Sequence, residues 1–184
     1  MEKAAVISPC GKYRYYLSRI WDNSKPTVLF IMFNPSTADH EVDDPTIRRC
    51  IGFAKSWDCG GLYVVNLFAR RDSDPRAIFG FWEDVGEDND AHIRRLVNGH
   101  LNSDGTVDGY IVIAWGGLAH PADVRWRRDE VIGNLPVNLI TCLGVTKSGE
   151  PKHPLYVPAS TKPIPYQKAI WGSMVYEGGD DAGK

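Results

Sequence analysis

Two asparagines stand where long apolar runs of the sequence end. Asn34 follows the run "TVLFIMF" over residues 27–33, and Asn66 follows "LYVV" over residues 62–65. A side-chain amide offers two donor hydrogens and one acceptor oxygen, so it can orient a water molecule or pair with the edge of a nucleobase. Pro35 cannot donate a backbone hydrogen bond, so Asn34 also fits an Asn-Pro turn that ends a strand. Both roles stay open for Asn34.

A histidine lies beside a proline in the loop "TKSGEPKHPLY", which is rich in proline, glycine and lysine. The imidazole of His153 can donate a hydrogen bond to an anion that develops on a ligand. Its alternative role is that of an ordinary surface histidine. We take His153 as a candidate catalytic residue, with Lys147 and Tyr156 of the same loop as candidate binding residues.

The stretch "TADHEVDD" gathers Asp39, His40, Glu41, Asp43 and Asp44. A carboxylate or imidazole here can act as a general base, and we select Asp39 for that role. The same group can ligate a divalent metal. The third interpretation is structural, with one of the last two aspartates capping a helix and the others solvated.

The residues after Asn66 offer nucleic-acid contacts. Phe68 can stack on a base or pack in the core, and Arg70 or Arg71 can contact a phosphate. With a net charge of −2 and a pI near 6.2, the chain does not hold nucleic acid by bulk charge. Binding would depend on local arginine patches, which otherwise are solvated surface.

The pattern of apolar runs indicates the elements that position these residues. Continuous apolar runs are typical of buried parallel strands, and apolar residues at helical spacing follow them. The predicted strands cover residues 12–21 (half-exposed), 27–33, 62–68, 109–117 and 137–144, and the predicted helices 44–57, 89–97, 121–132 and 166–171.

Alternating strands and helices predict an α/β fold, a three-layer α/β/α sandwich with a largely parallel central sheet. We expect residues 1–176 to form one domain and residues 177–184 a polar tail. Ligands of such sheets bind beyond the carboxyl ends of the strands. The segments 34–44, 66–74, 115–120 and 144–156 should therefore meet around one site.

Four cysteines at positions 10, 50, 59 and 142 form no C-x-x-C pair. They indicate reduced, largely buried thiols and neither a disulfide framework nor a zinc site. The N-terminus shows no apolar signal segment, and no run is long enough to cross a bilayer. We expect a cytoplasmic protein that does not bind membranes, and the sequence leaves its oligomeric state open.

Several motifs together resemble a bacterial and phage family known as domain of unknown function 1643. They occur in the order "FNPSTAD", "DPTIRRCIGFAKSW", "GGLYVVNLFARRDSDP", "AWG" and "CLGVTKSGEPKHPLY". The resemblance runs from about Tyr13 to Tyr156. The family name carries no activity.

A more distant resemblance is to the uracil-DNA glycosylase superfamily, whose members are α/β/α sandwiches with a parallel sheet. "MFNPS" is similar to its G-I-N-P-G motif, which implies that Asn34 positions the attacking water, with Phe33, Pro35 and Ser36 beside the substrate. "YVVN" is similar to L-L-L-N, which implies base recognition by Asn66. "HPL" is similar to H-P-S, which implies that His153 stabilises the departing base anion.

Three positions depart from those motifs. Met32 and Ser36 stand in place of glycines, and Leu155 replaces a serine that touches phosphate in the superfamily. We expect a protein that recognises a nucleobase in nucleic acid or a nucleotide and hydrolyses its N-glycosidic bond without a cofactor or metal. The alternatives are a non-catalytic nucleotide- or nucleic-acid-binding module and, second, a metal-dependent hydrolase built on the acidic stretch.

Overall fold

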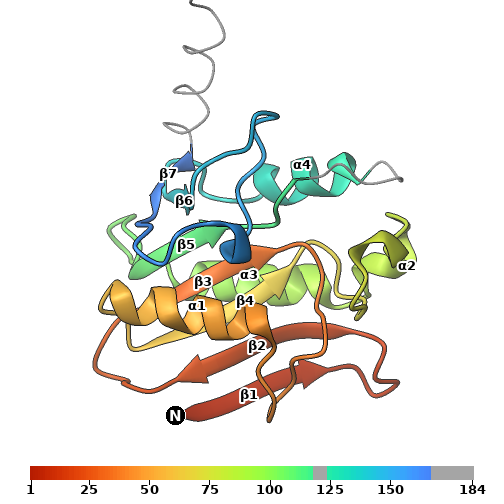
Figure 1. Cartoon of the computed structure of the whole chain (residues 1–184), viewed down its shortest axis with the longest axis horizontal. Helices are drawn as coiled ribbons and strands as arrows, with labels where there is room; N and C mark the ends of the chain where they lie inside the picture. Colours follow the sequence, from red (N-terminus) through yellow and green to blue (C-terminus); the bar gives the residue numbers. More distant parts are fainter. Residues whose placement is uncertain (118–123, 167–184) are drawn as a thin grey trace, which may run out of the picture.

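One mixed sheet organises the computed structural model, which describes residues 1–117 and 124–166 (Figure 1). Within these residues seven strands pair in the order β1-β2-β4-β3-β5-β6-β7. The strands are β1 (Glu2–Ile7), β2 (Arg14–Ile20), β3 (Thr27–Met32), β4 (Gly61–Asn66), β5 (Gly109–Ile113), β6 (Ile140–Cys142) and β7 (Ile164–Pro165). The helices are α1 (Pro45–Ser56), α2 (Trp82–Val85), α3 (Asn89–Gly99) and α4 (Arg125–Gly133), with 3-10 turns η1 (Pro75–Ala77) and η2 (Pro154–Tyr156).

The centre of the sheet is parallel and its edges are antiparallel. Strands β4, β3, β5 and β6 run in one direction, whereas β1 and β2 at one edge and β7 at the other run against their neighbours. The α/β class is confirmed, but the sheet is mixed rather than largely parallel. A short turn joins β1 to β2, and such a turn permits only antiparallel pairing.

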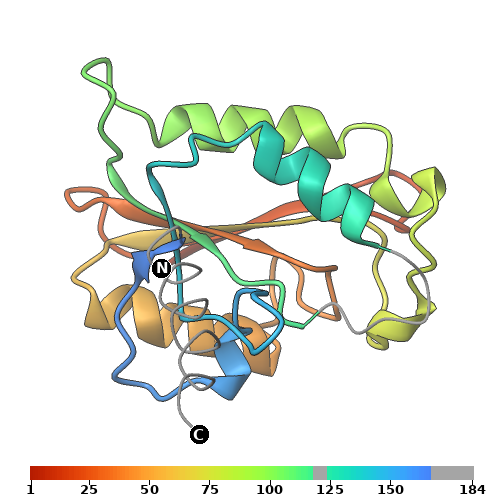
Figure 2. The same ribbon diagram turned by 90° about the horizontal axis from the view of Figure 1, so that it is seen from above.

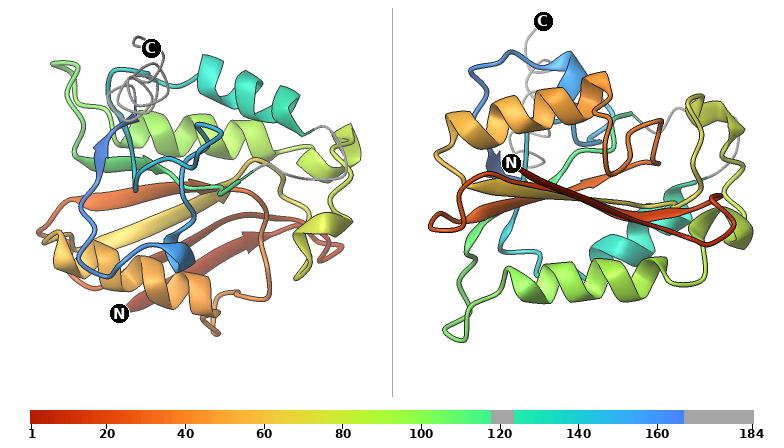
Figure 3. Two further views of the ribbon diagram at one scale, coloured as in Figure 1. Left: turned by 45° about the horizontal axis from the view of Figure 1, so that its top comes forward. Right: turned by 90° about the horizontal axis from the view of Figure 1, so that it is seen from below.

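Helices cover both faces of the sheet. Helix α1 lies on one face, and α3 and α4 lie on the other (Figures 2 and 3). The core is divided accordingly into a cluster that includes Cys50 and Phe53 of α1 and a cluster that includes Ile93 and Val97 of α3. Residues 28–32 of β3 are buried on both faces, which explains their continuous apolar run.

Helix α1 starts where the sequence predicts. The Asp44 side chain accepts a hydrogen bond from the Ile47 amide, and Pro45 occupies the first turn, where no amide is needed. The predicted helices over residues 89–97 and 121–132 correspond to α3 and to α4, which is described from Arg125. The predicted helix over residues 166–171 and the tail at 177–184 lie outside the described residues.

Strand β2 differs from its prediction as half-exposed. It lies between β1 and β4, and most of its side chains are buried on both faces. Arg14 pairs with Ile7 and Tyr16 pairs with Val6, so Tyr15 is one extra residue on this strand. Such a bulge changes which face the following side chains point to. Arg14 and Arg19 of this strand are buried, at 2% and 0% exposed.

The thiols follow the expectation from the sequence. Cys50, Cys59 and Cys142 are buried, Cys10 is exposed, and none of them forms a disulfide. Among the described residues, the helices are too short or too polar for any of them to cross a bilayer.

Candidate functional site

A cavity of about 590 Å³ opens at the carboxyl ends of the central strands. Its walls include Met32 at the end of β3, Asn66 of β4, Trp115 after β5, Asp44 at the start of α1 and Tyr156 of η2. From β3 the chain passes to β4 on one side and later returns to β5 on the other, so the strand order reverses at β3. Ligands of open α/β sheets bind at such a reversal, and this volume suits a small molecule.

Asn34 lines this cavity, and its side-chain amide is anchored through the nitrogen. Its Nδ2 donates to the backbone oxygens of Asp72, at 2.9 Å, and Pro35, at 3.2 Å. Because both neighbours are carbonyl oxygens, the nitrogen must face them and the orientation of the amide is fixed. Oδ1 accepts no hydrogen bond from any described residue. An anchored acceptor of this kind can hold one hydrogen of a water molecule.

The side-chain amide of Asn66 has no hydrogen-bond partner among the described residues. The residue is 1% exposed and lines the cavity, yet its Nδ2 finds no acceptor among the described residues. Its backbone oxygen accepts from Nδ2 of Asn89 at 3.0 Å. A buried donor without an acceptor costs stability and normally signals a missing partner. A ligand with an acceptor at the cavity wall would supply it.

His153 lines the cavity as a neutral imidazole. Its Nδ1 accepts a hydrogen bond from the Leu155 amide at 3.3 Å, so the ring proton sits on Nε2. Burial lowers the pKa of His153 to about 4, against a weaker opposing effect of the Asp44 charge. At neutral pH this ring is therefore a hydrogen-bond donor without a charge.

The loop that carries His153 is fixed to both neighbouring elements. The Gly116 amide donates to the Pro151 oxygen at 2.9 Å, and a Cβ at Gly116 would come within 3.2 Å of the His153 Cβ. From α1, Arg49 donates to the backbone oxygens of Pro154, at 3.3 Å, and of Val157. These contacts hold the imidazole at the end of β5.

Aromatic rings form part of the cavity wall. Trp115 is 4% exposed, and its Nε1 donates to Oε2 of the buried Glu150 at 2.9 Å. Arg128 in turn pairs with the other oxygen of Glu150. Phe33 lines the cavity and makes an edge contact with Phe68, with ring centroids 5.4 Å apart. Planar, largely apolar walls of this kind suit a flat heterocycle.

The structure brings together six of the twelve site residues selected from the sequence. Asn34, Asn66, His153, Phe33, Ser36 and Tyr156 all line the cavity, although Tyr156 is 82% exposed. Asp39, Pro35, Phe68, Arg70, Arg71 and Lys147 are not part of its lining. The predicted segment 115–120 is described only to residue 117.

Most of the residues outside the cavity have structural contacts. Phe68 is fully buried between Phe33 and Trp126, so its ring belongs to the core and not to a stacking surface. Arg70 forms an ion pair with Asp84 at 2.8 Å. Pro35 and Arg71 form hydrogen bonds with backbone groups. The Pro35 oxygen accepts from the Asp72 amide, and Arg71 donates to the Gly11 oxygen at 3.3 Å. Lys147 is exposed.

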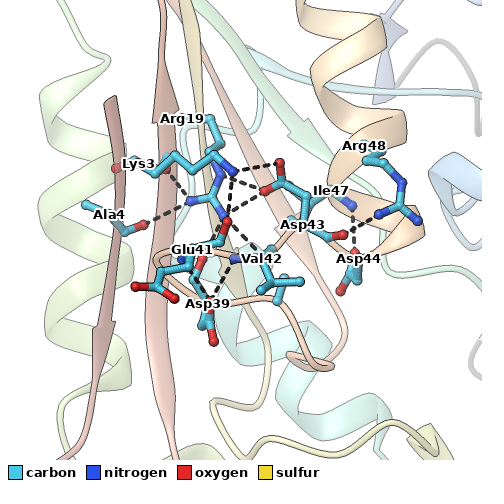
Figure 4. A network of polar contacts seen from close by, with 12 residues as sticks. Lys3, Ala4, Arg19, Asp39, Glu41, Val42, Asp43, Asp44, Ile47 and Arg48 are labelled. Carbon is cyan, nitrogen blue, oxygen red and sulfur yellow. Dashed lines mark hydrogen bonds and ion pairs between the residues drawn. The ribbon is translucent and has the colours of Figure 1, made fainter. Parts of the chain in front are cut away.

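The acidic stretch is a folded loop anchored by Arg19 (Figure 4). Arg19 donates to Asp43 Oδ1 at 2.7 Å and to the Asp39 oxygen at 2.6 Å. The Asp39 carboxylate accepts from the amides of Val42 and Glu41, and these bonds lower its pKa. The candidate general base Asp39 is thus occupied by its own turn.

The acidic-stretch residues considered as metal ligands do not converge on one point. Asp44 caps α1, while His40 is exposed and lies 3.8 Å from Glu41. Within residues 1–117 and 124–166, no three His, Cys, Asp or Glu side chains gather as metal ligands would. Of this acidic stretch, Asp44 lines the cavity.

Sequence reasoning missed Arg14. This arginine lines the cavity from β2, and burial lowers its pKa to about 10, with the charge of Asp44 opposing the shift and that of Arg71 adding to it. The strand over residues 12–21 was predicted to be half-exposed, which gave no reason to expect a buried arginine at this position. The presence of two arginines within a mostly apolar strand was the available signal.

The fold and this cavity define a mixed α/β protein with a cavity at the strand-order reversal. The chain matches the family model described as protein of unknown function (DUF1643) over residues 14–155, and it belongs to that family. The matched range extends from β2 into η2 and contains Arg14, Asn34, Asn66 and His153. No curated protein and no solved structure matches the chain.

Proposed function

We propose that the cavity binds a nucleobase and that the protein hydrolyses the N-glycosidic bond of a nucleotide or nucleic acid. One observation carries the proposal: Asn34, Asn66 and His153, from three separate segments, line one cavity. These are the positions at which the sequence resembles the uracil-DNA glycosylase superfamily. The parallel centre of the sheet, with helices on both faces, supports the same resemblance.

Recognition of the base falls to Asn66. Its amide makes no side-chain hydrogen bond to the described residues, so donor and acceptor are both available to the edge of a base. Trp115 and Phe33 provide flat walls beside it. An amide pair of this kind distinguishes bases by their pattern of donors and acceptors, with about 1–3 kcal/mol of discrimination.

Cleavage requires a water molecule and a stabilised leaving group. The Asn34 oxygen holds the water, which attacks the sugar carbon of the glycosidic bond as the base departs with the bonding electrons. The neutral His153 donates from Nε2 to the base anion, as a preorganised donor stabilises a developing charge. Asp44 accepts the proton from the water, and the base regains a proton on release.

A second candidate function is a non-catalytic binding module that uses the same cavity. Met32 and Leu155, which replace a glycine and a serine of the resembling motifs, both line the cavity. Their apolar side chains occupy space at positions where those motifs leave room for the substrate backbone. Such a module would bind nucleotides or nucleic acid without turnover.

The test is base release from free nucleotides and from single- and double-stranded oligonucleotides that carry uracil, hypoxanthine or modified pyrimidines. We expect release by the wild type and its loss in Asn34→Ala. Asn23→Ala is the matched control, because Asn23 is an exposed turn residue before β3. Binding that persists in Asn34→Ala, with no release by either protein, would favour the binding module. Neither release nor binding by folded protein would refute both.

A further inference from the structure

Arg14 is a buried cation without an ionic partner. It is 2% exposed, and its NH1 donates to the Ala38 oxygen at 2.8 Å. No carboxylate of the described residues forms an ion pair with it. Buried charges in proteins are normally paired, since an isolated one costs several kcal/mol. Burial lowers the pKa of Arg14, the charge of Asp44 opposes that shift without forming an ion pair, and the nearby charges of Arg71 and Arg19 add repulsion.

One edge of the Arg14 guanidinium, formed by Nε and the second terminal nitrogen, makes no hydrogen bonds to the described residues. Its Nε is buried and has no acceptor among the described residues, and its second terminal nitrogen makes no hydrogen bond to them. These two nitrogens form the parallel donor pair that binds a carboxylate or phosphate with two hydrogen bonds. Arg14 also lines the cavity, so the site for such an anion lies inside the cavity.

We propose that Arg14 binds the phosphate of a nucleoside monophosphate, with Asn66 of the same cavity on its base. This inference rests on the proposed function, which it narrows from nucleic acid to a free mononucleotide. Two buried donors without partners, Nε of Arg14 and Nδ2 of Asn66, are then satisfied by the two ends of one ligand. A cavity of about 590 Å³ accommodates a ligand of that size.

The surface of the protein favours a small ligand over a polymer. A strand of nucleic acid is held by exposed cations along its backbone. Here the two candidate arginines have protein partners: Arg70 pairs with Asp84 at 2.8 Å, and Arg71 donates to the Gly11 oxygen at 3.3 Å. The net charge of −2 adds no general attraction. A cation as buried as Arg14 suits a terminal phosphate that enters the cavity.

The experiment is calorimetric titration of the full chain with matched pairs of nucleoside and nucleoside 5′-monophosphate for each common base, and with inorganic phosphate alone. For at least one base we expect the monophosphate to bind about 10- to 100-fold more tightly than the nucleoside. Arg14→Met should remove that difference. Arg14→Lys keeps the charge without the paired donors, so it should recover only part of the difference.

The outcomes separate this inference from the proposed function. Equal affinity of nucleoside and monophosphate in the wild type, whatever the variants do, would overturn the role of Arg14 and leave base recognition standing. Binding of inorganic phosphate that depends on Arg14, without any nucleoside binding, would support the anion site and refute the nucleobase proposal. Binding of oligonucleotides in preference to mononucleotides would overturn the assignment to a free nucleotide.

Discussion

Replacing Asn66 with leucine should stabilise the protein and abolish its ligand binding. The amide of Asn66 is 1% exposed and its Nδ2 has no acceptor among the described residues, so the folded protein carries the desolvation cost of an unmade hydrogen bond. That cost is about 1–3 kcal/mol, and leucine of similar shape removes it. In a chain of this size each kcal/mol shifts the Tm by about 2–4 °C. We therefore expect Asn66→Leu to raise the Tm of the free protein by several degrees.

Asn89 provides the matched control on the neighbouring helix. It is also fully buried, and its Oδ1 has no donor among the described residues, but its Nδ2 donates to the backbone oxygens of Asn66, at 3.0 Å, and Leu67, at 3.1 Å. Asn89→Leu leaves both carbonyls without this donor, so it should lower the Tm by a similar amount. Differential scanning calorimetry of the two variants without ligand measures the opposite signs.

Changes in Tm of the same sign in the two variants would contradict an unpaired amide at Asn66. A Tm loss in Asn66→Leu as large as that in Asn89→Leu would mean that the Asn66 amide already has a stabilising partner. Retention of nucleoside affinity in Asn66→Leu would remove this residue from the binding site. A stabilised variant without binding would instead show that Asn66 is kept for function at a cost in stability.

Three further predictions concern neighbouring groups. Burial lowers the pKa of His153 to about 4, below its ordinary 6.5, so the stability that the neutral ring contributes is lost as pH falls from 6.5 to 4. The Tm difference between wild type and His153→Gln should therefore shrink over this range, and a constant difference would contradict the burial of this imidazole. Arg19→Met should lower the free energy of unfolding in urea by about 3–5 kcal/mol, whereas Lys3→Met should lower it by under about 1 kcal/mol. Equal losses would contradict the role of Arg19 as the anchor of the acidic loop. Arg49→Met should lower base release by about 100-fold through displacement of the His153 loop, with Arg48→Met as the neighbouring control that keeps activity.

The central elements were predictable because their signals are local. Continuous apolar runs identified β3, β4 and β5, and an aspartate followed by proline identified the start of α1. The rule that ligands bind at the carboxyl ends of parallel strands then brought Asn34, Asn66 and His153 to one site. The structure places all three on the cavity.

The features that the sequence did not predict depend on contacts between distant segments. The direction of β2 and β7 follows from pairing at the sheet edges, which no residue pattern encodes. The bulge at Tyr15 and the burial of Arg14 at the cavity depend on pairing with β1 and on packing, which no residue pattern marked. Asp39 was a plausible base, but its turn and the anchoring Arg19 lie 20 residues apart in sequence and meet only in the fold.

The most direct test of nucleobase binding in this cavity is nuclear magnetic resonance of the asparagine side-chain amides in the 20.5 kDa chain. Resonances are assigned by comparison with Asn66→Leu and Asn34→Ala, and nucleosides and their monophosphates are then titrated in. A base that pairs with Asn66 should shift its side-chain amide protons downfield, while those of exposed Asn23 stay unchanged. Saturating ligand that shifts other resonances but leaves the Asn66 amide in place would contradict the account.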